Sequence, residues 1–304
     1  MKSDAAFTVR KAFAETVAGV IPNKMARNRW RGILRYGLIR AVLLKLRMSS
    51  DNSAPKHYLT ICAIAKNEGP YFAEWIEWHR KMGVEKFYIY DNESTDDTKN
   101  ILAPYIESGL VEYVFWPGKK QQLPVYDDCI DKHRLDARWI AVIDIDEFIV
   151  PVKDKSIPEF LKRFEKFSAV EINWLVYGSG GAKKRENGSV MDRFKKHSHS
   201  GHILNRHAKT IINPRKVFNF IGCHEAAIIS GKIADSHGNI VRKQFRDREA
   251  QHDVICVNHY AVKSYEEFLQ KRARGRARIN KQRNLHYFEM FDLNDIEEAK
   301  KKNV

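Results

Sequence analysis

Three carboxylates follow a short apolar run in the middle of the chain. Asp144, Asp146 and Glu147 come directly after the residues 139–143. An apolar run of this length predicts a buried strand, and the period-two alternation of its side chains places Asp144 and Asp146 on the same side. Mg²⁺ and Mn²⁺ prefer such oxygen ligands, with water and substrate phosphates filling the other positions. The pattern indicates a divalent-cation site for a phosphate-bearing ligand, although solvated acids at a strand end explain a bare Asp-x-Asp equally well.

The segment that begins near His57 alternates between strand and helix patterns. We predict strands at 58–64, 86–90, 111–116 and 139–143, with helices at 71–82, 95–107 and 125–137. This order predicts an α/β fold, a mostly parallel sheet flanked by helices and joined by right-handed crossovers. Ligands of such sheets bind at the carboxyl ends of the strands.

Polar side chains end three of these strands. Lys66, Asn67 and Glu68 follow the first, Asp91 and Asn92 follow the second, and Asp144 and Asp146 follow the fourth. Because parallel strands end at one edge of the sheet, we expect these groups to share that edge.

The remainder of the chain has a weaker pattern. We predict a helix at 157–167, a strand at 169–174 and a helix from Ser264 through about Lys281. The domain organisation that we expect is a basic helical extension at 1–56, an α/β domain at 57–285 and a helical tail at 286–304.

Cysteine usage and hydropathy bear on the location of the protein. The four cysteines form no Cys-x-x-Cys pair, and a chain of 304 residues does not need a disulfide scaffold. No stretch reaches the roughly 18 apolar residues of a spanning helix, and the first residues lack the apolar core of a signal peptide. We therefore expect a cytoplasmic protein.

The net charge of +15 is concentrated near the start of the sequence. Residues 1–50 hold eleven Lys and Arg against Asp4 and Glu15, a net charge of +9. Apolar residues at helical spacing between Trp30 and Val42, with arginines between them, predict a basic amphipathic helix. Such a helix either lies on an anionic membrane surface or docks on its own domain with a solvated basic face. No nucleic-acid-binding motif accompanies it, so nucleic acid is not an expected partner.

These motifs together resemble glycosyltransferases of the GT-A fold, close to family 92 and to bacterial family-2-like enzymes. The segments that carry the resemblance are 64–68, 74–79, 90–97, 143–148, 258–260 and 263–264. The resemblance implies a UDP-sugar donor and a divalent cation, Mn²⁺ or Mg²⁺, held by Asp144, Asp146 and the late histidine His259. The donor-binding residues that it implies are Lys66, Asn67, Glu68, Asp91, Asn92, Asp144, His224 and Lys263.

The resemblance also implies an inverting transfer, in which one carboxylate removes the proton of the acceptor hydroxyl. Asp192 is the first candidate for this catalytic base, while Glu225 and Glu186 remain open. Lys263 is the first candidate for neutralising the phosphates, ahead of Arg272 and Arg276. Galactose is the first donor sugar to test, and the expected acceptor is a glycan or lipid-linked sugar in surface polysaccharide synthesis.

Two other functions fit parts of the pattern. A nucleotidyltransferase acting on a sugar phosphate uses a similar sheet and metal-held phosphates but releases pyrophosphate. A non-enzymatic basic adaptor for membranes or nucleic acid fits the charge alone. The sequence has neither a Gly-x-x-x-x-Gly-Lys-Ser/Thr loop nor a Gly-x-Ser-x-Gly motif, so P-loop enzymes and serine hydrolases are set aside.

Overall fold

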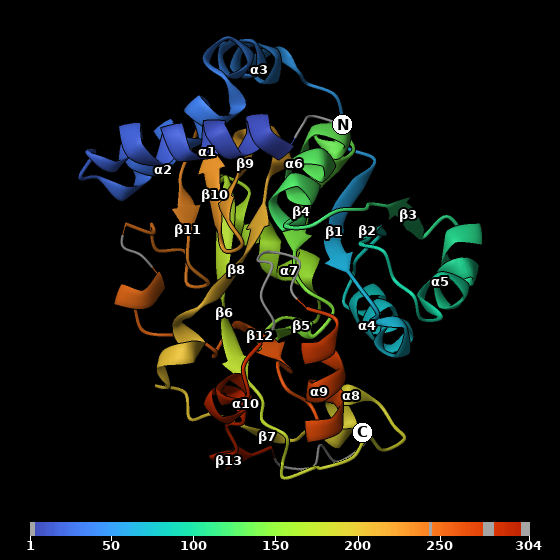
Figure 1. Ribbon diagram of the computed structural model, residues 1–304. Helices are drawn as coiled ribbons and strands as arrows, with labels where there is room; N and C mark the ends of the chain where they lie inside the picture. The colour runs from blue at the N-terminus through green and yellow to red at the C-terminus, as the bar shows by residue number, and fades with distance from the viewer. Residues whose placement is uncertain (1–3, 243–244, 276–282, 299–304) are drawn as a thin grey trace.

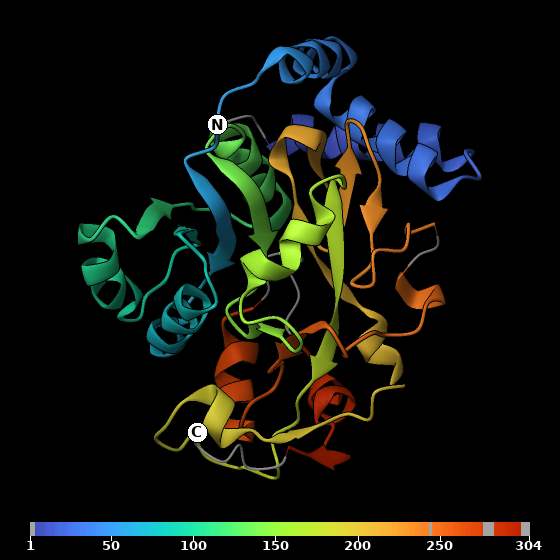
Figure 2. The same cartoon turned by 180° about the vertical axis from the view of Figure 1, so that it is seen from behind.

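A curled mixed sheet with helices on both faces forms the centre of the protein (Figures 1 and 2). The computed structural model describes residues 4–242, 245–275 and 283–298. The main path of the sheet has the order β3-β2-β1-β4-β8-β6-β12-β5, and β11 pairs with β6. The first four strands on this path are parallel: β1 (His57–Ala65), β2 (Lys86–Asp91), β3 (Val111–Phe115) and β4 (Ala137–Val142).

The second half of the sheet is mixed in direction. Strand β8 is antiparallel to both β4 and β6, whereas β12 is parallel to β6 and antiparallel to β5. These strands are β5 (Glu147–Pro151), β6 (Ala169–Val176), β8 (Ala208–Ile212), β11 (Ile233–Ala234) and β12 (Ile255–His259).

The alternating residues of β1 divide the core between the two faces. Leu59, Ile61 and Ala63 pack with α4 and α7, whereas Cys62 and Ile64 pack with α6 and the hairpin of β9 and β10. The elements are α4 (Gly69–Lys81), α5 (Thr98–Glu107), α6 (Gln122–His133), α7 (Ile157–Leu161), β9 (Val217–Gly222) and β10 (Glu225–Ile228). Each face is thus sealed by an apolar layer, which holds the strand ends in fixed positions.

The last part of the chain folds back near the carboxyl ends of β1 and β4 (Figure 1). Helix α9 begins with a capping box, in which Ser264 and Glu267 exchange hydrogen bonds between side chains and backbone. Tyr287 and Phe288 of the next helix pack on Phe268 of α9. The elements of this region are α8 (Val190–Arg193), β7 (Lys196–His197), α9 (Tyr265–Ala273), α10 (His286–Phe291) and β13 (Ile296–Glu297).

Three helices precede the sheet: α1 (Asp4–Gly19), α2 (Lys24–Tyr36) and α3 (Leu38–Ser50). They lie at the end of the molecule opposite α9 and α10 (Figure 1). Helix α2 packs on the hairpin, where Gly32 lies against Ala227. Gly37, with a φ of 102°, separates α2 from α3, so the single amphipathic helix predicted between Trp30 and Val42 is wrong. Within the described residues, no helix has both the length and the apolar character needed to span a bilayer.

The α/β fold predicted from the sequence is confirmed, and each predicted strand or helix of residues 57–143 has a counterpart. The helix predicted at 125–137 instead occupies 122–133, because β4 already begins at Ala137. The helix predicted at 157–167 continues beyond α7 only as a short 3₁₀ turn. Helix α9 ends at Ala273, and the rest of the helix predicted at 264–281 lies partly outside the described residues.

Candidate active site

A cavity of about 760 Å³ lies at the carboxyl ends of β1, β2 and β4. The turn of the β9–β10 hairpin and residues of α9 and α10 contribute other parts of its wall. Seven of the residues predicted for the site line it: Lys66, Glu68, Asn92, Asp144, Asp146, His224 and His259. The prediction that the polar strand ends share one edge is therefore confirmed for the ends of β1, β2 and β4.

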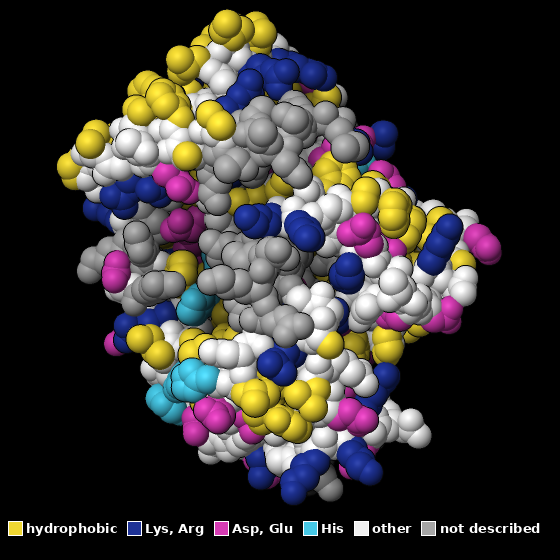
Figure 3. Space-filling view, viewed as in Figure 1, with side chains coloured by type: hydrophobic (Ala, Val, Ile, Leu, Met, Phe, Trp, Pro, Cys, Tyr) yellow, Lys and Arg dark blue, Asp and Glu magenta, His cyan; other side chains and the backbone are white. Residues whose placement is uncertain are grey.

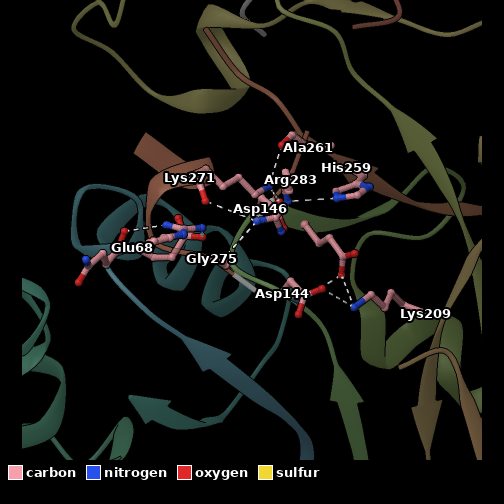
Figure 4. Close-up of polar contacts among 12 residues, drawn as sticks. Glu68, Asp144, Asp146, Lys209, His259, Ala261, Lys271, Gly275 and Arg283 are labelled. Carbon is pink, nitrogen blue, oxygen red and sulfur yellow. Dashed lines mark hydrogen bonds and ion pairs between the residues drawn. The ribbon is translucent and has the colours of Figure 1, made fainter. Parts of the chain in front are cut away.

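Asp146 is the most enclosed carboxylate of the cavity wall, with 5% of its surface exposed. Its Oδ2 accepts a hydrogen bond from Lys271 Nζ and lies 3.6 Å from His259 Nε2 (Figure 4). Lys271 is held in place because its Nζ also donates to the carbonyl of Ala261 at 2.7 Å. Burial alone would raise the pKa of Asp146, but Lys271 and His259 outweigh it and hold the pKa well below its usual range. Asp146 is therefore ionised.

Asp144 and Glu147 share a second lysine. Lys209 Nζ lies 2.8 Å from Asp144 Oδ2 (Figure 4). It also lies 3.1 Å from Glu147 Oε2. Glu147 Oε2 also accepts a hydrogen bond from the backbone N–H of Asp144 at 3.0 Å. Burial, reinforced by Asp144 and Asp146, raises the pKa of Glu147 to about 8. Residues 144–147, between the end of β4 and the start of β5, thus bring three acids together, one paired with Lys271 and two with Lys209.

The acids and one histidine fit a divalent cation. Asp146, Glu147 and His259 each offer one ligand atom, and these atoms lie within 4.8 Å of one another. In the described part of the chain, Glu147 Oε1 and His259 Nδ1 are buried without a hydrogen-bond partner. Burial lowers the pKa of His259, so the imidazole is neutral, which is the form that binds metals. This donor set matches the chemistry of Mn²⁺ or Mg²⁺, and it contains Glu147 in place of the predicted ligand Asp144, whose carboxylate pairs with Lys209.

Cationic side chains form much of the wall around these acids. Lys66, Lys119, Lys120, Arg274 and Arg283 line the cavity together with Lys271. Arg274 donates to the carbonyl of Asn67 at 2.7 Å and forms an ion pair with Glu68. The wall therefore combines buried acids with a surplus of cations, an arrangement suited to a polyanion such as a diphosphate.

Aromatic rings form another wall of the cavity. The rings of Trp174 and His259 lie 4.1 Å apart between centroids, and Trp174 also stacks on His207 at 4.9 Å. His224 meets the edge of Trp174 at 5.2 Å, and its Nδ1 lies 2.8 Å from the carbonyl of Ala208. Apolar surface beside a few fixed polar groups is typical of small-molecule sites.

The loops after the strands carry left-handed backbone conformations. Asn67, Glu93, Lys120 and Lys263 have φ values of 52°, 62°, 60° and 58°, although none is glycine. These residues follow β1, β2, β3 and β12 respectively. Such conformations cost about 1 kcal/mol or more and concentrate at functional sites. The strained backbone positions and the cavity therefore lie at the same edge of the sheet, which supports a functional site there.

Three residues predicted to bind the donor lie outside this cavity. Asp91 is buried and accepts hydrogen bonds from Tyr113 and from the backbone N–H of Ser94. These contacts give Asp91 a structural role. Asn67 and Lys263 instead line an adjacent cavity of about 460 Å³. Lys263 Nζ lies 4.0 Å from the ring centroid of Tyr71, whereas Lys271 forms the ion pair with Asp146.

The structure does not place the predicted catalytic bases in the cavity. The side chain of Asp192 is 79% exposed on α8, where it accepts a hydrogen bond from Ser189. Glu225 begins β10 and lines a separate small cavity with Asn28 and Glu171. Glu186 is an exposed loop residue. Position therefore argues against each of them as the base.

Arg272 and Arg276 were the other candidates for neutralising the phosphates. Arg272 Nε donates a hydrogen bond to the carbonyl of Arg283 at 2.8 Å, which gives Arg272 a structural role. Arg276 lies outside the described residues.

Four further residues of the site were not predicted from the sequence: Lys209, Lys271, Trp174 and His207. Lys209 had a usable signal, because it interrupts the apolar strand 208–212, and a lysine buried in a strand requires a charged partner. Lys271 had no such signal, since it lies among other cations of a helix. Trp174 and His207 reach the cavity through strand pairing across distant segments, which periodicity does not reveal.

Curated relatives match parts of the chain. A glycosyltransferase family 92 protein of Ricinus communis is 24% identical over 220 residues, covering 71% of this chain and 37% of that protein. A family 92 protein of Arabidopsis thaliana is 34% identical over 104 residues, 34% of this chain and 18% of its own. A galactan beta-1,4-galactosyltransferase of Arabidopsis thaliana is 28% identical over 175 residues, 52% of this chain and 33% of its own. The chain spans well under half the length of these relatives.

Solved structures give weak overall matches. The Staphylococcus aureus protein TarS, solved also in complex with UDP, has a TM-score of 0.35 and 14% identity over 52% of this chain and 47% of its own. The family model of glycosyltransferase family 92 matches residues 57–303, which start at β1 and leave out the three N-terminal helices. The matched segment includes every residue that lines the cavity. The chain belongs to glycosyltransferase family 92, and the resemblance seen in its motifs is confirmed.

Proposed function

We propose that this glycosyltransferase is metal-dependent and inverting, and that it transfers a hexose from a UDP-sugar to a glycan or lipid-linked acceptor. The observation that carries the proposal is the group of buried acids at the strand ends inside a cationic cavity. Acids alone would repel a nucleoside diphosphate. Acids that hold a divalent cation, surrounded by lysines and arginines, attract one.

The proposed cation site consists of Asp146, Glu147 and His259, with Asp144 available at its edge. A Mn²⁺ or Mg²⁺ ion bound there would neutralise charge on the diphosphate as it leaves. Lys271 and Arg274 are fixed by their contacts with Ala261 and Asn67, so they face the donor without reorganisation. The wall thus supplies positive charge where the leaving group becomes more negative.

The reaction forms one bond and breaks one at the anomeric carbon. The acceptor hydroxyl attacks this carbon from the face opposite the phosphate, the bond to the phosphate oxygen breaks, and the hydroxyl proton passes to a base. UDP leaves with the electron pair of the broken bond. The rings of Trp174, His207 and His224 line the cavity, and we infer that they orient the sugar ring.

Galactose is the donor sugar that we propose first. Support comes from the two relatives named galactan beta-1,4-galactosyltransferases, which match 52% and 60% of this chain. The acceptor that we propose is a growing surface polysaccharide or its lipid-linked precursor, assembled at the cytoplasmic face of the membrane. Measuring UDP release with the polysaccharide and with the lipid-linked precursor in separate assays would distinguish these two acceptors.

A panel of UDP-sugars tests the reaction. We expect purified protein to release UDP from UDP-galactose faster than from UDP-glucose, with Mn²⁺ present and an oligosaccharide acceptor added. Removal of the metal by a chelator should abolish the release. Formation of pyrophosphate from UTP and a sugar phosphate, without UDP release from any UDP-sugar, would instead establish a nucleotidyltransferase and overturn the proposal.

A further inference from the structure

Helix α3 exposes apolar side chains on the face that turns away from the protein. Leu38, Ile39, Val42, Leu43 and Leu46 are 56%, 78%, 59%, 59% and 63% exposed. Their spacing of one, three and four residues places them along one side of the helix. The opposite side carries Ala41 and Leu44, which are buried in a cluster with residues of the β9–β10 hairpin. Helix α3 is therefore apolar on two faces, and its own protein covers only one.

Helix α1 repeats this arrangement. Val9, Phe13 and Val17, spaced four residues apart, are each 45% or more exposed, whereas Ala14 and Ala18 are buried. Figure 3 shows hydrophobic side chains gathered along the upper edge of the molecule, over α1 and α3. We call this set of α1 and α3 side chains the apolar ridge. Exposed apolar surface of this extent marks an interaction site in soluble proteins.

Cations flank the apolar ridge. Arg40, Lys45 and Arg47 of α3 are exposed, as is Arg10 of α1. On a helical projection of α3, Arg40 and Arg47 lie on one side of its exposed apolar residues and Lys45 lies on the other. The described residues of α3 include no acid. A ridge with cations at its borders complements a surface that is apolar inside and anionic at its rim, which is the chemistry of an anionic bilayer.

Buried contacts of α2, which lies between α1 and α3 in the chain, attach these helices to the domain. Arg35 of α2 donates to the carbonyl of Phe220 and forms an ion pair with Asp127, and only 3% of its side chain is exposed. Gly32 permits close contact, because a Cβ at this position would lie 2.3 Å from Ala227 Cβ. The arginines of residues 1–50 thus serve two purposes, since Arg35 fixes the helices to the hairpin while those of α3 remain outside.

We propose that α1 and α3 lie in the plane of an anionic lipid bilayer. The apolar ridge enters the boundary between headgroups and acyl chains, and Arg40, Lys45 and Arg47 contact lipid phosphates. The active-site cavity lies at the other end of β1 and β4, so the catalytic domain projects away from the lipid (Figure 1). Association of two copies through the ridge is disfavoured by comparison, since it would bring the same cations together.

Vesicle sedimentation with the full chain tests the proposal. We expect binding to vesicles of phosphatidylcholine with phosphatidylglycerol and little binding to phosphatidylcholine alone, with the binding reduced by salt. The double variant Ile39→Ser/Leu43→Ser should bind at least about tenfold more weakly, because it lacks two apolar side chains that the bilayer would bury. The matched control Val152→Ser, which removes a side chain that is 54% exposed elsewhere, should bind like the parent.

A second variant separates charge from apolar burial. Arg40→Glu/Arg47→Glu should lose binding to the anionic vesicles while the melting temperature stays within a few degrees of the parent. Equal binding by parent and Ile39→Ser/Leu43→Ser would overturn the proposal. A dimer in light scattering that the same double variant abolishes, with no vesicle binding by the parent, would show instead that the ridge joins two copies. UDP release on a soluble acceptor is measured without vesicles, so these outcomes do not depend on the proposed reaction.

Discussion

The two ends of the molecule use cationic side chains in opposite ways. At the carboxyl ends of the strands, Lys209 and Lys271 are 2% and 6% exposed and lie against carboxylates. At the other end, Arg40 and Arg47 of α3 remain in solvent beside apolar side chains. A buried cation requires partners of opposite charge, whereas an exposed one is available to a ligand that arrives from outside. Positive charge in this chain therefore indicates function only together with burial and neighbours.

The sharpest test of the buried end is removal of its central charge. Asp146→Asn should lower the rate of UDP release by about 1,000-fold or more, because the variant lacks the ionised carboxylate of the proposed cation site. Initial rates with saturating UDP-galactose and Mn²⁺ measure this loss. The exposed acid Asp97 provides the matched control, and Asp97→Asn should retain the parental rate. Parental turnover by Asp146→Asn would refute the assignment of the site.

The second test asks whether Lys209 balances acids that also accept a metal. Lys209→Met should lower the free energy of unfolding by about 3 kcal/mol, since Asp144 and Glu147 lose their shared cation. Added Mn²⁺ should raise the melting temperature of this variant more than that of the parent, because the ion can replace the missing charge.

Lys132 supplies the control for this second test. It pairs with Asp128 at 2.8 Å on the surface and is 49% exposed, so Lys132→Met should change stability by less than about 1 kcal/mol. A melting temperature of Lys209→Met that is insensitive to Mn²⁺ would show that these acids do not bind the ion.

The third test compares two arginines of the N-terminal helices. Arg35→Ala should destabilise the protein by about 3 kcal/mol, because it leaves Asp127 and the carbonyl of Phe220 without their buried donor. Arg40→Ala should change stability by no more than about 0.5 kcal/mol, because Arg40 is exposed. Chemical denaturation of both variants measures the difference, and equal midpoints would contradict the distinction between the two arginines.

The sequence predicted the parallel half of the molecule best. Residues 57–143 combine a period-two or helical pattern with polar residues at each strand end, so local signals and final positions agree. Asp146 and His259 were predicted as ligands of one ion. Asp146 Oδ2 and His259 Nε2 lie 3.6 Å apart, although the two residues are 113 positions apart in the chain. This juxtaposition followed from the family resemblance and not from periodicity.

The mixed half of the sheet and the loops were harder to predict from the sequence, for physical reasons. Strand β8 pairs antiparallel with β4 and β6, which brings Lys209 to the acids through contacts between distant segments. The base was assigned from loop position, and Asp192 proved to serve the short helix α8. The helix predicted between Trp30 and Val42 failed at Gly37, because a glycine permits the positive φ that ends α2. For Lys209 a distant pairing, and for the predicted helix a single backbone position, outweighed the local pattern.

The smallest effect that we predict concerns how closely α2 approaches the hairpin. Alanine favours a helix by about 1 kcal/mol over glycine, so Gly19→Ala, where nothing lies within 4 Å of the added Cβ, should be neutral or slightly stabilising. At Gly32 the same methyl group would meet Ala227 Cβ at 2.3 Å, and overpacking of this kind costs about 1–3 kcal/mol. Gly32→Ala should therefore be the less stable of the two in thermal melts. If the two variants melt together, α2 can shift on the hairpin, and the tight packing of Gly32 against Ala227 would not constrain it.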